Sequence, residues 1–377
     1  MKILHVSDEN KFVDLALQTF ERLYPKKNTT LYLSSKKKIL ENNHTPSLSF
    51  SKWSFLKPAF YRNLKKYDLI IFHNFGSIEY WMLANIFSKK QKLAWIGWGF
   101  DYSDYMYTNA EDLLLDESKA FNRKYLMKKN TIPKIIKKYI KKLAKASSIK
   151  KIHSFSSVIE NEYELVKKSK ELKKVPIFVP WNYDILQNYS EFEDHKSAQI
   201  GTKILIGNSA SITNNHFETF KVLKRINLNK KNKLEVLCPL NYGNAYYAKK
   251  VKEIGKNAFG DMFQSIDNFL DTNEYFLKLK DCGYVIMNHV RQQAVGNIIL
   301  ALYQGSRVFL NEKSPVLSFL RKEGAFVNEI NELIEKPYLI EKPLSDDEKK
   351  KNRTVVLKHW SSESIDAKTK KLVEYHL

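Results

Sequence analysis

Short, nearly continuous apolar runs alternate along this chain with longer stretches in which apolar residues recur every three or four positions. The run Leu-Ile-Ile-Phe at residues 69–72 is typical of a strand buried on both faces of a parallel sheet. Between residues 12 and 23 the apolar positions fall on one face of a helix. This alternation predicts an α/β fold. In the first half we expect strands at 2–7, 29–35, 68–74, 93–97, 152–156 and 175–180, with helices at 12–23 and 78–87.

A polar segment at residues 191–201 interrupts the alternation, and we interpret it as a linker between domains. Two successive αβ runs then predict two doubly wound domains, at 1–190 and 202–345. The default ligand site of such a pair is a cleft at the carboxyl ends of the strands. A last helical stretch, 346–377, could pack back on the first domain. In the second domain we expect strands at 203–206, 234–238, 262–266, 284–288 and 307–310, with helices at 215–225, 245–256, 271–280, 297–304 and 316–322.

The composition supports folded domains and adds an unusual charge. Of the 377 residues 43% are hydrophobic, which excludes a disordered chain, and 63 Lys and Arg against 41 Asp and Glu give a net charge of +22. Only eight of these basic residues are arginines, the residue type that suits bidentate recognition of bases and phosphates. Because no DNA- or RNA-binding motif is recognisable either, nucleic-acid binding is the weakest explanation of the charge.

The cysteines and the hydropathy restrict the class of protein further. Cys238 and Cys282 lie far apart, and no metal-ligand spacing occurs, so we expect neither a zinc site nor a disulfide framework. The beginning of the chain reads as a strand and lacks the apolar core of a signal peptide. No run of about 18 apolar residues occurs, so we expect no transmembrane helix. These features suit a reducing cytosol.

The lysines are concentrated in one segment, residues 128–151. On a helix in this segment, Ile136, Tyr139, Ile140 and Leu143 share one face. A basic amphipathic helix is typical of binding to an anionic membrane surface, whereas a solvated lysine face on an ordinary helix remains the alternative. The lysines that we single out for membrane contact are Lys134, Lys137, Lys138, Lys141 and Lys142.

The strongest local motif begins the second domain, where a buried strand ends in Gly207-Asn208-Ser209 and a polar turn leads into a helix. Asn215, with Glu218 three residues later, fits an N-cap and capping box. Backbone N–H groups beside a helix N-terminus suit a phosphate, although an ordinary βα loop has the same composition.

Two further motifs follow strands of the second domain. Arg291 comes directly after a strand and could clamp a diphosphate, while Gln292 and Gln293 offer amides to sugar hydroxyls. Gly296 and Asn297 would open the next helix toward the phosphates. Tyr242 follows another strand, where its ring could stack on a nucleobase or simply pack in the loop.

The first domain has candidates of a different kind. Asp101 follows a strand that ends in aromatic residues and glycines, a composition common at carbohydrate-binding surfaces. His73 lies at the end of another strand, so His73 and Asp101 are candidates for a general base or for binding a hydroxyl group. His5, inside the first strand, fits a hydrogen-bonded core histidine better than a catalytic one.

Taken together, these motifs resemble one family, the bacterial TDP-N-acetylfucosamine:lipid II N-acetylfucosaminyltransferases, the 4-alpha-L-fucosyltransferases of glycosyltransferase family 56. The resemblance spans about residues 1–330 and is strongest at 203–311. It is carried by Gly-Asn-Ser after a strand, Asn-His opening a helix, Pro-x-x-Tyr after the next strand, and Arg-Gln-Gln-x-x-Gly before an apolar helix. Trp98, Gly99, Asp101 and Tyr102 resemble the family's Trp-x-Gly-x-Asp-x-Tyr element, although they run Trp-Gly-x-Asp-Tyr here and Phe100 stands where a small residue is expected.

The resemblance implies a GT-B glycosyltransferase, in which two Rossmann-like domains face each other across a cleft. The second domain would bind a TDP-sugar, and the first would receive an undecaprenyl-diphosphate-linked acceptor, at the cytoplasmic face of the inner membrane. The sugar would be a 4-acetamido-4,6-dideoxyhexose used in surface polysaccharide such as the enterobacterial common antigen. GT-B enzymes typically need no metal, so Arg291 and helix N-termini would stabilise the departing diphosphate. A nucleotide-sugar epimerase, or a GT-B transferase with a soluble acceptor, remains the alternative.

Overall fold

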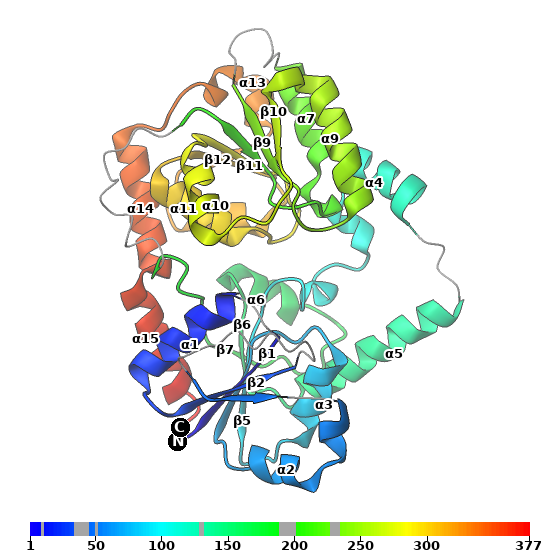
Figure 1. Ribbon diagram of the computed structural model, residues 1–377, viewed down its shortest axis with the longest axis vertical. Helices are drawn as coiled ribbons and strands as arrows, with labels where there is room; N and C mark the ends of the chain where they lie inside the picture. Colours follow the sequence, from blue (N-terminus) through cyan, green and yellow to red (C-terminus); the bar gives the residue numbers. More distant parts are fainter. Residues whose placement is uncertain (9–10, 34–44, 50–51, 128–131, 188–200, 227–233) are drawn as a thin grey trace. The chain divides into compact units, whose positions relative to one another are not determined.

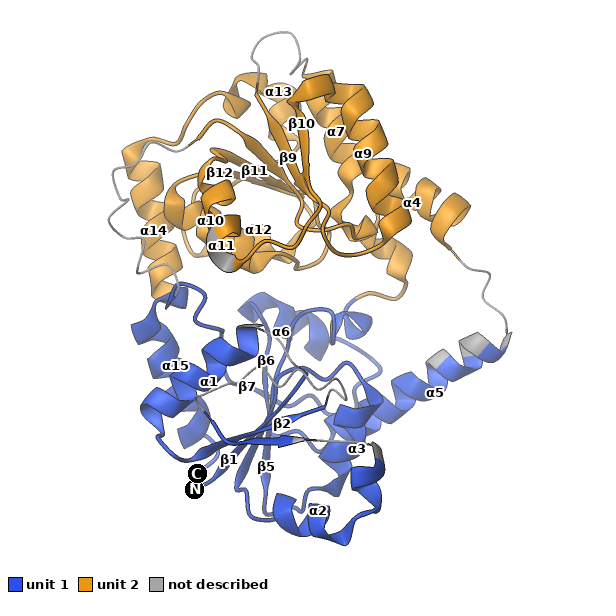
Figure 2. Cartoon of the chain, in the orientation of Figure 1, with its two compact units in different colours: residues 1–106, 129–190, 359–377 blue, residues 107–128, 191–358 orange. Residues whose placement is uncertain are grey.

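A computed structural model of the chain describes residues 1–8, 11–33, 45–49, 52–127, 132–187, 201–226 and 234–377. It divides the chain into two compact units, shown in Figure 2. Unit 1 comprises residues 1–106, 129–190 and 359–377, and unit 2 comprises residues 107–128 and 191–358. Each unit contains one parallel sheet with helices on its faces, as the alternation predicts (Figure 1).

The units differ from the expected domains at two places. Residues 107–128 leave the first half of the chain and fold with unit 2. The expected C-terminal helix is two helices, α14 (Asp346–Trp360) and α15 (Ser362–Glu374), and only residues 359–377 belong to unit 1. The expected linker lies outside the described residues except for Gly201, whose N–H donates to the Lys280 carbonyl of unit 2 at 3.2 Å.

Unit 1 contains a seven-stranded parallel sheet with the order β3-β2-β1-β4-β5-β6-β7. Six of these strands coincide with expected ones. The seventh, β3, was not expected because its Ser-Leu-Ser sequence has a single apolar residue. The strands are β1 (Ile3–Ser7), β2 (Asn28–Tyr32), β3 (Ser47–Ser49), β4 (Leu69–Phe72), β5 (Lys92–Ile96), β6 (Ser154–Ser156) and β7 (Ile177–Phe178).

Helices cover both faces of this sheet, because side chains alternate between the faces along each strand. On one face Ile3 and Ile71 pack with Phe20 of α1 and Leu372 of α15. On the other face the core residues come from α2, α3, α5 and α6, and they include Leu64, Leu83, Ile149 and Val166. The helices of unit 1, besides α15, are α1 (Lys11–Leu23), α2 (Pro58–Leu64), α3 (Ile78–Ile86), α5 (Ile132–Ile149) and α6 (Glu160–Lys167).

Unit 2 contains a six-stranded parallel sheet with the order β10-β9-β8-β11-β12-β13. The short edge strand β13 was not expected, because Asn-Glu carries no apolar signal. The strands are β8 (Ile204–Ile206), β9 (Val236–Pro239), β10 (Phe263–Ile266), β11 (Tyr284–Met287), β12 (Arg307–Leu310) and β13 (Asn328–Glu329). The helices, besides α14, are α4 (Asp116–Phe121), α7 (His216–Arg225), α9 (Ala245–Phe259), α10 (Thr272–Lys280), α11 (Val295–Gln304), α12 (Pro315–Lys322) and α13 (Glu332–Glu335).

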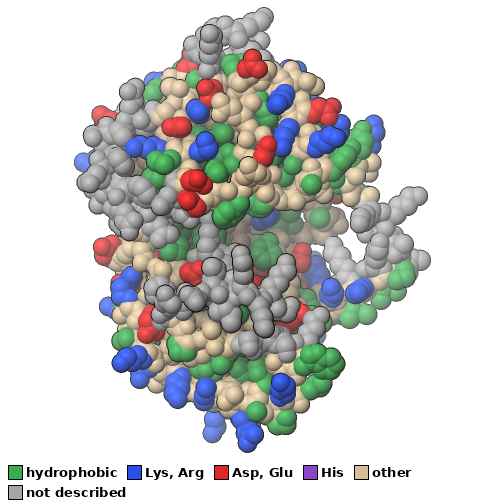
Figure 3. All heavy atoms as spheres, viewed as in Figure 1, with side chains coloured by type: hydrophobic (Ala, Val, Ile, Leu, Met, Phe, Trp, Pro, Cys, Tyr) green, Lys and Arg blue, Asp and Glu red, His purple; other side chains and the backbone are tan. Residues whose placement is uncertain are grey.

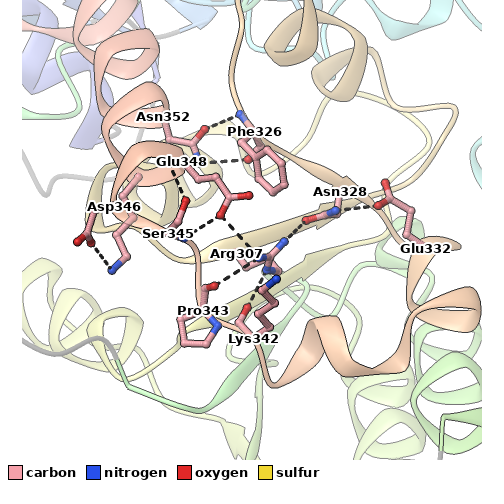
Figure 4. A network of polar contacts seen from close by, with 11 residues as sticks. Arg307, Phe326, Asn328, Glu332, Lys342, Pro343, Ser345, Asp346, Glu348 and Asn352 are labelled. Atoms are coloured by element: carbon pink, nitrogen blue, oxygen red, sulfur yellow. Dashed lines mark hydrogen bonds and ion pairs between the residues drawn. The ribbon is translucent and has the colours of Figure 1, made fainter.

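A buried arginine holds the approach to α14 in place (Figure 4). Arg307, the first residue of β12, is 2% exposed and donates from Nη1 to Asn328 Oδ1 at 2.9 Å and from Nε to the Lys342 carbonyl at 2.9 Å. Its Nη2 lies 3.9 Å from Glu348 Oε2. Burial lowers the pKa of Arg307, and Glu348 opposes that shift. This network ties the sheet edge to the segment that begins α14, at the end of β12 opposite its carboxyl end.

Candidate functional site

The candidate ligand-binding residues of unit 2 follow the carboxyl ends of three strands, β8, β9 and β11. Gly207 follows β8 directly, Tyr242 comes three residues after β9, and Asn288 follows β11. The loops after β8 and β9 are joined, because Ala210 N donates to the Tyr242 carbonyl at 2.7 Å. In parallel αβ sheets this edge is where ligands bind.

A buried asparagine shapes the turn after β8. Gly207 has φ +66°, and a Cβ at this position would lie 2.6 Å from Asn214 Oδ1, so only glycine fits. Asn214 Oδ1 accepts from the Asn208 N–H at 2.9 Å, and Asn214 Nδ2 donates to the Ser209 carbonyl at 2.9 Å. The Ser209 hydroxyl is also used inside the turn, where Oγ accepts from Asn214 Nδ2 at 3.1 Å. Ser209 is buried and therefore shapes the turn, whereas direct contact with a ligand was expected.

Three of the expected donor-binding residues meet in one hydrogen-bonded group. Asn208 Nδ2 donates to the Tyr242 hydroxyl at 2.7 Å, and Gln293 Nε2 donates to Asn208 Oδ1 at 2.9 Å. Thr213 Oγ1 completes the group by donating to Gln293 Oε1 at 2.8 Å. Tyr242 is 56% exposed, so its position suits stacking against a planar group.

Buried acceptor atoms lie beside this group. His289 Nε2 donates to Asn214 Oδ1 at 2.8 Å, because the Asn214 amide nitrogen faces carbonyl groups. This hydrogen bond fixes the tautomer and leaves His289 Nδ1 as a buried acceptor that has no hydrogen-bond partner among the described residues; the same holds for Gln292 Oε1. Burial lowers the pKa of His289 well below its usual value, and Arg291 and His216 add to that shift. Buried polar groups are normally paired, so these atoms are candidates for hydrogen bonds to a ligand.

The motif after β11 leads into a helix N-terminus. Arg291 Nη1 donates to the neighbouring Gln292 carbonyl at 2.8 Å. Ala294, with φ +57°, turns the chain into α11, so Gly296 lies in the first turn, where backbone N–H groups lack intrahelical acceptors. Asn297 is in the same turn, but its side chain donates to the Tyr275 hydroxyl of α10 at 2.8 Å.

The expected capping box at the start of α7 is wrong. Asn215 precedes α7 with φ +50° and makes no capping hydrogen bond with its side chain. Its Nδ2 donates to the Asn288 carbonyl at 2.8 Å, and its Oδ1 accepts from Leu115 N at 3.0 Å. Glu218 accepts from the N–H and the hydroxyl of Ser118, both at 2.7 Å. The reason is that the segment containing α4 packs against the start of α7. Its N–H groups bind the side chains of Asn215 and Glu218, which a local cap would otherwise use.

Asp101, in unit 1, is an internal organiser of its loop. One carboxyl oxygen accepts from the Phe75 N–H at 2.9 Å and from Trp95 Nε1 at 2.8 Å, and the other accepts from the Trp98 N–H at 2.7 Å. Burial raises the pKa of Asp101, whereas these hydrogen bonds and Lys145 oppose the shift. The residue is 1% exposed. This arrangement contradicts the expected direct contact with an acceptor hydroxyl, because the carboxylate is buried and already used by the chain.

His73 is also fully buried, and it belongs to a chain of hydrogen bonds. Asn28 Nδ2 donates to Glu21 Oε2 and to the Tyr24 carbonyl, both at 2.8 Å, so Asn28 Oδ1 faces His5 Nε2 at 3.2 Å. His5 Nε2 therefore carries the proton, and His5 Nδ1 accepts from His73 Nε2 at 3.0 Å. Burial lowers the pKa of His5 to about 4, with the Asn28 hydrogen bond opposing. His5 is thus a satisfied core histidine, as expected.

The chain continues from His73 to the end of the sheet. Because His73 Nε2 carries the proton, His73 Nδ1 accepts from the Tyr183 hydroxyl at 3.1 Å. The Tyr183 oxygen in turn accepts from Trp98 Nε1 at 2.6 Å. Burial lowers the pKa of His73, and the nearby His5 adds to the shift. The partly exposed Tyr183, rather than the buried His73, is the part of this chain that a ligand could reach.

The expected membrane lysines on α5 differ in their surroundings. Lys137 and Lys141 are exposed. Lys142 Nζ lies 2.6 Å from Glu171 Oε1, so the chain itself holds this charge in an ion pair. The side chains of Lys134 and Lys138 lie outside those that the structure describes. Among the described residues, no helix is long and apolar enough to cross a membrane.

Sequence reasoning missed several residues that shape these sites. Asn214, His289 and Tyr183 were not singled out, and Lys145, which lies on the expected basic helix, is buried and donates to the Asp101 carbonyl. A signal existed for His289, since it follows a buried strand at the ligand edge. Tyr183 and Lys145 are defined by contacts with residues far away in the sequence, and Asn214 by hydrogen bonds within its own turn. Within the described part of the chain, no group of three or more His, Cys, Asp or Glu side chains could hold a metal ion.

Solved structures with the same fold are glycosyltransferases and related enzymes. They include Anabaena HepE in complex with UDP and glucose (11% identity, 100% of both chains covered, TM-score 0.66). A glycosyltransferase from Rickettsia africae is 12% identical (100% of this chain, 98% of that chain, TM-score 0.64). Sucrose-phosphate synthase from Thermosynechococcus elongatus is 10% identical over the same shares, with a TM-score of 0.64. These likenesses show the expected GT-B fold.

The sequence itself matches one family profile, 4-alpha-L-fucosyltransferase glycosyl transferase group 56, over residues 138–341. The match covers more than half of the chain and includes the strands and loops of unit 2 that carry the donor-site motifs. It confirms the resemblance seen in those motifs. The chain therefore belongs to the 4-alpha-L-fucosyltransferase family, glycosyl transferase group 56, and is a glycosyltransferase.

Proposed function

We propose that this glycosyltransferase moves a 4-acetamido-4,6-dideoxyhexose from a TDP-sugar to an undecaprenyl-diphosphate-linked saccharide. The reaction would serve bacterial surface polysaccharide synthesis at the cytoplasmic face of the inner membrane. Family membership supports the transfer reaction. HepE, which shares the fold, binds UDP and glucose, and this supports a nucleotide-linked donor. The sugar, the TDP group and the lipid-linked acceptor follow from the resemblance of the motifs.

A single observation carries the donor side of the proposal. The Asn208–Tyr242–Gln293 group lies at the carboxyl ends of the unit 2 strands, next to buried acceptor atoms of His289 and Gln292. A nucleotide sugar offers a planar base for Tyr242 and hydroxyl donors for the buried acceptors. The N-terminus of α11 and Arg291 supply positive potential for the diphosphate.

The chemistry of transfer follows from these positions. The bond between the sugar's anomeric carbon and the diphosphate oxygen breaks, and negative charge develops on the leaving TDP. Arg291 and the first-turn N–H groups of α11 would stabilise that charge without a metal ion. The oxygen of the acceptor hydroxyl forms the new bond to the anomeric carbon, and its proton passes to water or to the departing diphosphate.

On the acceptor side, the proposed roles of Asp101 and His73 become indirect. Asp101 positions the loop that carries Trp98. His73 orients the Tyr183 hydroxyl, which also receives the Trp98 indole N–H. We therefore place the acceptor sugar against Trp98 and Tyr183, with His73 and Asp101 as positioning residues.

Arg291→Ala tests the donor side. We expect the variant to stay folded and to lose transfer, along with most of the rise in melting temperature that TDP-sugar causes in the wild type. Arg225→Ala, at an exposed position on α7, is the matched control and should keep both. Wild-type turnover in Arg291→Ala would reject the assignment, and a screen of TDP-, UDP- and GDP-sugars by the same shift identifies the donor nucleotide.

Metal independence needs a separate assay. Transfer measured in EDTA should equal transfer in Mg²⁺, because protein groups would neutralise the leaving diphosphate. Loss of turnover in EDTA that Mg²⁺ restores would overturn this part of the proposal.

Membership in a glycosyltransferase family argues against the epimerase alternative. Product analysis checks this directly, since an epimerase leaves the nucleotide attached to the sugar.

A further inference from the structure

One helical layer of unit 1 leaves large apolar side chains exposed. On α5, Ile136, Tyr139, Ile140 and Leu143 are 54%, 64%, 59% and 54% exposed. They share the face that the sequence pattern predicts, and the helix contacts the core through Ile149. An exposed apolar stripe of this kind on a basic helix requires a partner or an interface.

A second exposed apolar element lies in the same layer. The 3₁₀ helix η1 (Lys52–Leu56) directs Phe55 toward the core, while Trp53 and Leu56 are each 72% exposed. The Tyr61 hydroxyl of α2 donates to the Phe55 carbonyl at 2.6 Å and so holds η1 in place. The two outward side chains are therefore presented by an anchored segment.

Both elements belong to the same side of the unit 1 sheet. Phe55 of η1, Leu64 of α2 and Ile149 of α5 pack against one core cluster, together with Leu83 of the intervening α3. The opposite side of the sheet is covered by α1 and α15. Figure 3 shows hydrophobic side chains together with Lys and Arg over the lower end of unit 1, where α2 lies, and along α5.

The charge around both elements has one sign. Residues 42–67 and 129–159 contain no Asp or Glu. Lys57, Arg62, Lys65 and Lys66 are exposed beside Trp53 and Leu56, as Lys137 and Lys141 are on α5. From elsewhere in unit 1, Glu171 reaches α5 and forms an ion pair with Lys142. Trp and Tyr with flanking lysines are typical of the interface between headgroups and acyl chains.

We propose that the segment Trp53–Leu56 is a second membrane-insertion element, which together with α5 seats this face of unit 1 on an anionic bilayer. The inference rests on the proposed function, because a polyprenyl-linked acceptor requires the enzyme to reach a bilayer. It assigns a role to Trp53 and Leu56 that the transfer chemistry does not use. Charge complementarity with anionic headgroups and the exposed Trp and Leu favour a bilayer over a nucleic acid, which would need no apolar surface.

Vesicle flotation of the full chain tests the proposal. We expect binding to vesicles of phosphatidylcholine with one quarter phosphatidylglycerol and little binding to phosphatidylcholine alone. Trp53→Ser with Leu56→Ser should weaken binding by at least about tenfold, because two large apolar side chains no longer enter the interface. The matched control is Phe269→Ser with Leu277→Ser, two exposed apolar residues of unit 2 (83% and 54%), which should bind as the wild type does.

Tryptophan fluorescence reports on the segment itself. Trp53 is 72% exposed, whereas Trp81, Trp95, Trp181 and Trp360 are at most 7% exposed, and Trp98, the sixth tryptophan, is partly exposed. Anionic vesicles should shift the emission to the blue, and Trp53→Phe should remove most of that shift while flotation stays near the wild-type level. A blue shift that persists in Trp53→Phe contradicts insertion at this site.

The outcomes separate this inference from the proposed function. Flotation needs neither donor nor acceptor, and the thermal shift by TDP-sugar needs no vesicles. Wild-type flotation of Trp53→Ser with Leu56→Ser overturns the inference even if transfer is confirmed. Equal binding to neutral vesicles, or binding of RNA at about 0.2 M salt without vesicle binding, also overturns it. The milder Leu56→Gln, with an unchanged melting temperature, should give a partial loss and so excludes misfolding as the cause.

Discussion

At the scale of single residues, buried polar side chains shape both candidate sites by binding backbone groups of their own chain. Asn214 holds the turn that follows β8, and Asp101 holds the loop that carries Trp98. The sequence marks Asp101 as chemically interesting because it follows a strand beside aromatics. Only the structure shows that its carboxylate accepts hydrogen bonds from three N–H groups of its own chain. We therefore assign Asp101 a positioning role, because its carboxylate is buried and already bonded to its own loop.

Asp101→Asn tests this positioning role. The amide presents an NH₂ group where the carboxylate accepted hydrogen bonds, so we expect a loss of about 1–3 kcal/mol in the free energy of unfolding. Asp104→Asn, at an exposed position in the same loop, is the control and should change stability by less than about 0.5 kcal/mol. Unfolding in urea measures both variants. An unchanged stability of Asp101→Asn with abolished turnover would instead favour a catalytic carboxylate.

The buried histidines lead us to expect that the folded chain loses stability in acid. Burial lowers the pKa of six of them, which are His5, His73, His153, His216, His289 and His376. Below pH 6.5 the histidines of the unfolded chain bind protons, whereas the same histidines stay neutral in the folded chain. The free energy of unfolding is therefore highest above pH 6.5 and falls as the pH drops from there through the pKa values of the folded state, about 4 for His5.

Each fully neutral histidine should cost about 1 kcal/mol between pH 6.5 and 5.5, and the raised pKa values of Asp101 and Asp184 oppose this in part. Urea unfolding at pH 7.5, 6.5 and 5.5 measures the trend. A free energy of unfolding that stays constant or rises as the pH falls would contradict it.

At the scale of elements, the strands and helices with a long apolar pattern were predicted well, whereas the strands with almost no apolar pattern were missed. The edge strands β3 and β13 escaped prediction because their sequences carry almost no apolar signal, and pairing with a neighbouring strand forms them. The start of α7 was misjudged for a related reason. Its first turn is bonded to α4, which lies about a hundred residues earlier in the chain.

Glu218→Ala tests the docking of α4 on α7. The buried Ser118 would lose the acceptor for both its N–H and its hydroxyl, so we expect a cost of about 2–4 kcal/mol to unit 2. Lys221→Ala removes an exposed ion pair to Glu117 between the same helices and should cost under about 1 kcal/mol. Thermal unfolding compares the two. Similar effects of the two substitutions would show that the docking does not depend on Glu218.

At the scale of the whole molecule, the two units are not consecutive pieces of chain. The last residues return to unit 1, where Trp181 Nε1 donates to Thr369 Oγ1 at 2.8 Å and Leu372 lies in the core beside α1. This return was suggested by the sequence as a helix beyond the second αβ run. Where the helix divides between the units was decided by packing.

Leu372→Ala tests whether the C-terminal helix stabilises unit 1. Leu372 is fully buried, so the substitution should cost about 2–5 kcal/mol and lower the unfolding transition of unit 1. Leu377→Ala, at an 81% exposed position, should have almost no effect. Differential scanning calorimetry with TDP-sugar present separates the transitions, since the donor should raise only that of unit 2. Equal melting profiles for Leu372→Ala and the wild type would contradict the assignment.

By itself, the sequence determined the two αβ runs, the family and the loops that form the donor site, because period, strand ends and motif spacing are local properties. It placed Asn208, Tyr242 and Gln293 at one sheet edge, and the structure brings them into hydrogen-bond contact. Only the tertiary structure decided which polar groups stay available. Asn215 and His73 are bound by partners far away in the sequence, and no local pattern records a hydrogen bond made across about a hundred residues. Ser209 and Asp101 are bound by nearer residues, but only the folded loops bury them and use their polar atoms.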